Sequence, residues 1–145
     1  MKINDNAVLK TVKEIEIHAS LDSVWKTQTD IDSWAIWQPE ISEARLNGSL
    51  KIGTKFKWKS GGFTLNSTIE EIESNKVIGW SGSGFGASAI HIWEFSSLEN
   101  GNTLVRTSES MDGWFVKLLK GMMRKKLNAS LETWLNALKK ASENE

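Results

Sequence analysis

The chain has 145 residues, 39% hydrophobic and 25% charged, values typical of one globular domain and not of a disordered or membrane-embedded protein. Its 18 basic and 18 acidic residues balance to zero net charge, so no long-range field attracts a polyanion and nucleic acid is not an expected partner. Cysteine is absent, which excludes disulfides, thiol nucleophiles and thiolate metal sites. We expect a single domain over residues 1–145.

No stretch approaches the roughly 20 apolar residues that a membrane span needs, and residues 1–10 contain no apolar run typical of a signal peptide. We therefore expect a cytoplasmic protein without stable membrane insertion. The chain has eight tryptophans and no tyrosine, so its aromatic surface is bulky and nearly free of acid-base groups. That composition suits ligand binding better than proton transfer.

The first elements are a strand and two short helices. Residues 8–18 alternate between apolar and polar and predict a strand. Ser20 stands at the N-cap position of a short helix. Residues 30–37 predict a second short helical piece, which Pro39 prevents from continuing.

From residue 41 to 109 the apolar period changes to two, and turn residues at 47–48, 61–62, 74–75, 82–86 and 100–101 divide the segment into six strands. Strict alternation in residues 55–59, KFKWK, predicts one wet and one covered face. Ile90 and Ile92 fall on the outer face if His91 points inward, and a bulge is the alternative. The side chains assigned to the covered face are Phe56, Trp58, Leu65, Ser67, Ile69, Ile78, Trp80, His91, Trp93 and Phe95.

After Gly113 the pattern becomes helical, and Gly121 marks a point where the long C-terminal helix bends or divides. Its apolar stripe consists of Val116, Leu119, Met123, Leu127, Leu131, Trp134 and Leu138. A sheet with one apolar face must be covered, and this helix is the only element long enough. We predict an α+β fold in which a curved, seven-stranded antiparallel sheet surrounds the helix and leaves an apolar pocket between them.

Several motifs occur along the chain in the same order as in one group of ligand-binding proteins. Residues 30–41, DIDSWAIWQPEI, resemble the D-x-x-x-W-x-x-W-x-P-x-I/V stretch of START-like ligand-binding (SRPBCC) proteins of the polyketide cyclase/dehydrase group. Residues 67–69, 78–80, 91–95 (H-x-W-x-F) and 101–109 (G-x-T-x-V-x-x-x-E) resemble later strands of that group. The resemblance implies the helix-grip fold and an elongated cavity for lipids, polyketides or other apolar metabolites. It implies no single reaction, because the superfamily includes cyclases, hydrolases, carriers, receptors and chaperone cofactors.

The predicted ligand-binding side chains are Trp34, Trp37, Phe56, Trp58, Leu65, Ile69, Trp80, Phe85, His91, Trp93, Phe95, Leu119, Met123 and Leu127. For the aromatic residues of the sheet, core packing is the alternative, since aromatic side chains on the inner face of a sheet usually pack in the core. Trp34 and Trp37 either form the rim of the pocket or anchor their segment. Residues 81–86, SGSGFG, are either a flexible gate with Phe85 at its tip or a mobile hairpin end.

His91 and Glu109 are the candidate catalytic residues. A buried histidine and a desolvated carboxyl could act as an acid-base pair, and a hydrogen-bonded structural pair is the alternative. His18 and His91 are too few and too far apart to suggest a metal site, and we expect no cofactor. Five basic residues between positions 117 and 126 either form a solvated helix face or touch anionic lipid headgroups or nucleic acid.

Our first functional hypothesis is a module that binds a hydrophobic small molecule, a lipid, polyketide or aromatic metabolite. The alternatives are a cyclase- or dehydratase-like enzyme that uses His91 or Glu109, and a protein-interaction cofactor. The sequence leaves the choice between monomer and dimer open.

Overall fold

The computed structural model describes residues 1–144 and contains one seven-stranded sheet in the order β1-β7-β6-β5-β4-β3-β2, in which every neighbouring pair is antiparallel. The strands are β1 (Leu9–Ile17), β2 (Ile41–Leu46), β3 (Lys55–Ser60), β4 (Phe63–Glu73), β5 (Val77–Gly84), β6 (Ala87–Ser97) and β7 (Thr103–Asp112). Successive strands from β2 to β7 are neighbours, and β1 closes the far edge beside β7.

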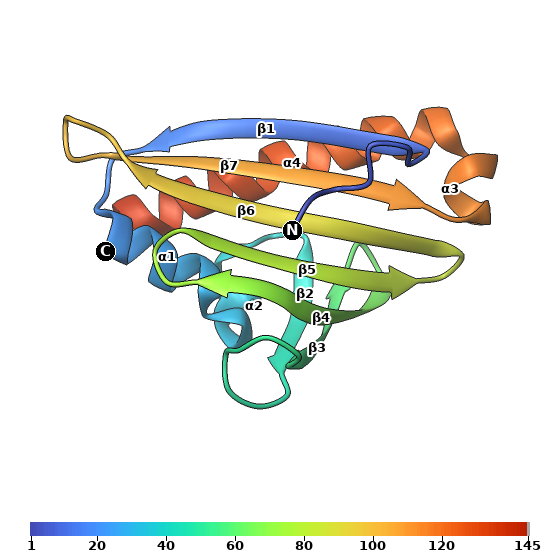
Figure 1. Ribbon diagram of the computed structural model, residues 1–145, viewed down its shortest axis with the longest axis horizontal. Helices are drawn as coiled ribbons and strands as arrows, with labels where there is room; N and C mark the ends of the chain where they lie inside the picture. Colours follow the sequence, from blue (N-terminus) through green and yellow to red (C-terminus); the bar gives the residue numbers. More distant parts are fainter. Residues whose placement is uncertain (145) are drawn as a thin grey trace.

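The helices are α1 (Leu21–Thr29), the short 3-10 helix η1 (Ile31–Ser33), α2 (Trp34–Trp37), α3 (Trp114–Leu118) and α4 (Lys120–Glu143). The Ser20 hydroxyl caps α1 by accepting a hydrogen bond from the Ser23 amide at 3.2 Å, as predicted. In Figure 1, α4 runs along the sheet behind β6 and β7, with α1 and α2 at one end and α3 at the other. This is the predicted helix-grip arrangement, and no helix in the described chain is long and apolar enough to cross a membrane.

Pairing between β5 and β6 is unbroken, so His91, Trp93 and Phe95 point inward without a bulge. The irregularities lie elsewhere, between Ile69 and Glu71 in β4 and near the start of β2. Ile92 on the outer face is nevertheless 6% exposed. The Met1 side chain lies over this part of the sheet, and its amino group pairs with the Glu71 carboxylate at 2.6 Å. The Met1 side chain therefore shields Ile92 from solvent on the outer face of the sheet.

Two apolar clusters share the interior. The larger one holds seven tryptophan and phenylalanine side chains of the sheet and of the first helices, and Trp134, Leu135 and Leu138 of α4 pack against them. The smaller one joins Leu9 to Val116, Leu127 and Leu131 near α3. The second half of α4 is thus fixed in an aromatic core, and its first half covers a more loosely filled part of the sheet.

The predicted division of the C-terminal helix is confirmed, whereas Gly121 itself lies inside α4. Leu119, with φ −113° and ψ 37°, separates α3 from α4 two residues before Gly121. The segment 81–86 differs from the expected loop, because β5 continues to Gly84 and only Phe85 and Gly86 form the turn. The glycines and serines of residues 81–84 alternate and pair with β6. The segment predicted as a gate is therefore the end of a regular hairpin.

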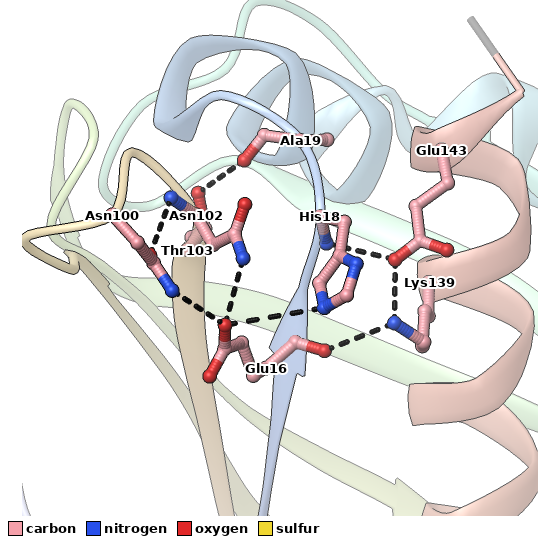
Figure 2. A network of polar contacts seen from close by, with 8 residues as sticks. All are labelled: Glu16, His18, Ala19, Asn100, Asn102, Thr103, Lys139 and Glu143. Atoms are coloured by element: carbon pink, nitrogen blue, oxygen red, sulfur yellow. Dashed lines mark hydrogen bonds and ion pairs between the residues drawn. The ribbon is translucent and has the colours of Figure 1, made fainter.

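A polar network closes the end of the molecule opposite α3 (Figure 2). The Glu16 carboxylate accepts a hydrogen bond from the Asn102 amide at 2.7 Å, and the Glu143 carboxylate accepts one from the His18 backbone N–H at 2.7 Å. The Lys139 ammonium donates to both the Glu16 carbonyl and the Glu143 carboxylate. Hydrogen bonds lower the pKa of Glu16, chiefly from Asn102, and of Glu143, chiefly from Lys139. The end of α4 is therefore tied to β1 and to the β6–β7 turn.

Candidate ligand-binding cavity

A cavity of about 210 Å³ lies between the inner face of the sheet and the first half of α4. Its sheet wall includes Trp58 of β3, Leu65 of β4 and Met111 of β7. The helix wall is formed by Met123, Leu127, Leu131 and Trp134. These four positions follow one helical face at spacings of three and four residues, which is why a single stripe can line the whole cavity.

A second hollow of about 80 Å³ lies deeper against β4 to β7 and is bordered by Trp80 and His91. The two spaces share Trp58, Leu65 and Glu109 as lining residues. The register explains this sharing, because Glu109 lies opposite His91, which in turn lies opposite Trp80. Glu109 is consequently the one acidic group that both spaces contact among residues 1–144.

Glu109 and His91 are in contact, as the acid-base prediction requires. His91 Nδ1 lies 3.1 Å from Glu109 Oε1, and His91 Nε2 lies 2.8 Å from the Thr107 hydroxyl. The His91 side chain is 3% exposed and that of Glu109 is 13% exposed. The cross-strand pair therefore sits in an apolar setting with little access to water.

Burial shifts both groups toward their neutral forms. Desolvation lowers the pKa of His91 to about 3 and raises the pKa of Glu109 to about 8. With its proton on Nδ1, the imidazole donates to Glu109 Oε1 and accepts from the Thr107 hydroxyl at Nε2. Glu109 Oε2 has no hydrogen-bond partner in the described part of the chain, so it can carry the proton. At neutral pH the pair can present a carboxylic acid to the cavity.

The predicted ligand-binding residues fall into two groups in the structure. The larger cavity is lined by Trp58, Leu65, Phe85, Met123 and Leu127, and the deeper hollow by Trp58, Leu65, Trp80 and His91. The others line neither space: Trp34, Trp37, Phe56, Ile69, Trp93, Phe95 and Leu119. Contact of any of these side chains with a ligand stays a prediction.

Trp34 lies at the centre of the aromatic core, as its anchoring alternative expects. Its ring centroid is 5.0 Å from that of Trp134 and 5.5 Å from that of Trp80, and the side chain is 0% exposed. Gln28 holds both indoles: its carbonyl accepts from Trp34 Nε1 at 2.8 Å and its Oε1 accepts from Trp134 Nε1 at 3.1 Å. These aromatic contacts fill the interior beside α1 and α2 and confine the open space to the α3 end.

Sequence reasoning missed several lining residues. Met111 could have been found, because it continues the inward alternation of β7 two residues beyond Glu109. Leu131 and Trp134 belong to the predicted helix stripe, but nothing in that stripe distinguishes cavity-lining positions from core positions. Gln38 and Ser130 also line the cavity, and nothing in their sequence setting indicates it.

Comparison with known proteins places the chain in a family. Residues 9–143 match the family model described as polyketide cyclase / dehydrase and lipid transport. The chain belongs to this family. No curated protein sequence matches it.

Solved structures of the same fold come from several bacteria. Hypothetical protein jhp0584 from Helicobacter pylori is 22% identical with a TM-score of 0.83, over 95% of this chain and 90% of that one. A START superfamily protein from Mycobacterium smegmatis is 16% identical with a TM-score of 0.81, over 93% and 97%. The Zhui aromatase/cyclase from Streptomyces sp. R1128 is 14% identical with a TM-score of 0.81, over 93% of each chain. At these identities the likeness establishes the helix-grip fold of this family member.

Proposed function

We propose that this family member binds a small, apolar, ring-containing molecule in the cavity beneath the first half of α4. The observation that carries the proposal is a mainly apolar space with a few polar side chains, of which the Glu109 carboxyl also borders the deeper hollow. Such a combination is typical of ligand sites, in which burial supplies affinity and a few polar atoms set orientation. A protonated Glu109 would donate a hydrogen bond to a carbonyl or hydroxyl of the ligand.

The size of the cavity limits the ligand. About 210 Å³ lies below the roughly 300 to 1,000 Å³ of drug-sized sites, which favours a compact molecule of about two fused rings. An aromatic group of that size buries about 250 Å², worth about 6 kcal/mol. That energy corresponds to a Kd on the order of 10 to 100 µM.

The test uses 2-naphthol, a two-ring aromatic alcohol, and a variant that fills the cavity. Ser130 lines the cavity, so Ser130→Phe should occupy the ligand space and weaken binding at least about tenfold, or about 1.4 kcal/mol. Ala129 is its exposed neighbour on α4, and Ala129→Phe should bind like the wild type. Isothermal titration calorimetry measures both. Equal affinities for wild type and Ser130→Phe would refute binding in this cavity.

The contact between Glu109 and His91 favours a second function, proton transfer to or from a bound substrate. A carboxyl with a pKa of about 8 holds its proton at neutral pH and can donate it as a general acid. His91 Nδ1–H would then stabilise the carboxylate left behind, at 3.1 Å. The ketone 2-tetralone tests this function. Protonated Glu109 would donate its proton to the carbonyl oxygen while a water molecule removes the α-proton, so α-proton exchange in D₂O should be faster than without protein, and Glu109→Gln should abolish the acceleration.

A further inference from the structure

Five large apolar side chains are exposed at the α3 end of the molecule, around the opening of the cavity. Their exposed fractions are 43% for Phe63, 65% for Phe85, 61% for Trp114, 73% for Leu118 and 55% for Met122. We call this set the mouth surface. Trp114 is the only exposed one of the chain's eight tryptophans in residues 1–144. The other exposed large apolar side chains of this part of the chain, Met1, Val12, Ile36 and Ile52, include no aromatic one.

The mouth surface is continuous. The Phe85 ring centroid lies 5.4 Å from that of Trp114, and Phe63, Phe85 and Met122 all line the cavity. Trp114 and Leu118 are one helical turn apart on α3, and Met122 lies at the start of α4, just after the break at Leu119. In Figure 1, α3 lies at the same end of the molecule as the β5–β6 turn. The apolar residues therefore surround the opening as one patch.

The patch is also held in place by the backbone. The Phe115 amide donates a hydrogen bond to the Gly86 carbonyl at 3.0 Å, which attaches α3 to the hairpin end. Gly113 has φ 117°, and a Cβ there would come within 2.3 Å of the Gly86 carbonyl oxygen. The close approach requires glycine. The mouth surface is thus presented at a fixed place on the protein.

Basic side chains predominate on α3 and the start of α4, whereas Glu40 lines the cavity and Asp112 directly precedes Gly113. Residues 113–131 contain five basic side chains and no acidic one, although the whole chain has no net charge. The Lys126 ammonium lies 5.7 Å above the Phe63 ring, so at least one cation borders the patch directly. The five basic residues are Lys117, Lys120, Arg124, Lys125 and Lys126.

We propose that the mouth surface docks reversibly on an anionic lipid bilayer. Aromatic, leucine and methionine side chains flanked by lysines are the composition of interfacial protein segments, whose apolar groups enter the boundary between headgroups and acyl chains. The lysine and arginine ammonium and guanidinium groups would meet lipid phosphates while their stems cover apolar surface. Docked in this way, the opening of the cavity faces the acyl region, and an apolar molecule could pass between the two without crossing water.

The same surface fits a bilayer better than nucleic acid. Nucleic-acid phosphates are bound by basic side chains and bases stack on aromatic rings, but neither contact accounts for the exposed aliphatic side chains of Leu118 and Met122. A bilayer accounts for the apolar patch and the basic residues together. Docking also does not require an occupied cavity, so it stands apart from the ligand proposal.

Sedimentation with large vesicles tests the proposal. The protein should bind vesicles of phosphatidylcholine with about one third phosphatidylglycerol at least tenfold more strongly than pure phosphatidylcholine, and about 0.5 M NaCl should weaken the binding. Lipids brominated along the acyl chain should quench the fluorescence of wild type more than that of Trp114→Phe. Equal binding to both vesicle types, or no quenching difference, would overturn the proposal.

Matched variants locate the surface. Leu118→Ser with Met122→Ser should reduce vesicle binding about tenfold. Ile36→Ser with Ile52→Ser, at positions 85% and 62% exposed outside the mouth surface, should leave it unchanged. Ser130→Phe, which fills the cavity, should also bind vesicles normally, so loss of ligand binding and loss of docking can be told apart. A second copy of the chain that covers the mouth surface in solution, seen as a dimer that Leu118→Ser with Met122→Ser dissociates, would contradict docking.

Discussion

At the scale of single residues, Glu109 is the side chain on which both proposed functions depend. Its place on β7 directly opposite His91 puts a carboxyl at an inward position beside β6, the strand that also carries Trp93. Burial there favours the protonated form, and the His91 Nδ1–H and Thr107 hydroxyl complete a short hydrogen-bonded chain. The same desolvation that would make Glu109 a ligand contact or an acid makes the stability of the protein depend on pH.

The direction of that dependence follows from the two pKa shifts. Glu109 titrates at about 8 in the folded chain, against an ordinary value of 4.5, so the folded state keeps a proton that the unfolded state loses as pH rises. The pKa of His91 is about 3 in the folded chain, against an ordinary value of 6.5, so as pH falls the unfolded state binds a proton that the folded state does not bind. Between pH 4.5 and 6.5 each state binds one proton in this pair, and the two contributions offset each other.

Stability should therefore fall between pH 6.5 and 8, where only Glu109 differs between the two states. The expected slope is about 1.4 kcal/mol per pH unit, so the free energy of unfolding should decrease by about 2 kcal/mol over this interval. Glu109→Gln should remove the decrease, and Glu99→Gln in an exposed turn should keep it. Urea unfolding at the two pH values measures the effect, and a wild type equally stable at both would refute the buried, protonated carboxyl.

At the scale of elements, the structure is organised by where the C-terminal helix is interrupted. The break at Leu119 separates α3 from α4. It lets α3 turn onto the β5–β6 hairpin end while α4 continues along the sheet. The contact between these two pieces depends on Gly113 and Gly86, both at positive φ. The geometry of the cavity opening is therefore set by backbone conformations that only glycine adopts readily.

Substitution of the two glycines of this region should have opposite effects. Gly113→Ala would force a Cβ toward the Gly86 carbonyl at φ 117°, which should destabilise the fold by about 2 to 3 kcal/mol. Gly121→Ala has no atom within 4 Å of its Cβ and lies inside α4, so it should stabilise by about 0.5 to 1 kcal/mol. Thermal unfolding compares the two variants, and equal midpoints would contradict the close approach of α3 to the hairpin.

The elements themselves could be predicted because each has a strong local signal. Alternation in Lys55–Ser60 and the apolar stripe of α4 identify a half-covered strand and a long amphipathic helix. The glycines and serines of residues 81–86 predict a loop, because both residue types are frequent in turns, whereas pairing with β6 extends the strand to Gly84. Tertiary hydrogen bonds outweighed local propensity there.

The location of the cavity could not be predicted from the sequence for a related reason. The sequence pattern does not distinguish core tryptophans from cavity-lining ones. It places three at inward strand positions and one on a short helix: Trp58, Trp80, Trp93 and Trp34. Which of them fills the core depends on where Trp134 and Gln28 meet them, a contact between residues 106 positions apart. Only the three-dimensional arrangement separates the aromatic core from the cavity wall.

At the scale of the whole molecule, the interior has a closed and an open half. The aromatic core and the network around Glu16 and Lys139 close the end that carries α1 and α2. The cavity, the Glu109–His91 pair and the mouth surface lie together toward the other end. The proposed binding site therefore borders the closely packed aromatic core on one side and lies toward the α3 end on the other.

The central claim is that an apolar molecule enters this open half, and NMR of the methionine methyl groups tests it most directly. The chain has four methionines. Met111, Met122 and Met123 line the cavity, and Met1 lies on the outer face of the sheet beside Gly79. Titration of ¹³C-methyl-methionine protein with 2-naphthol should shift the Met111 and Met123 signals and leave the Met1 signal unchanged. Shifts confined to Met1, or no shift at saturating 2-naphthol, would contradict the account.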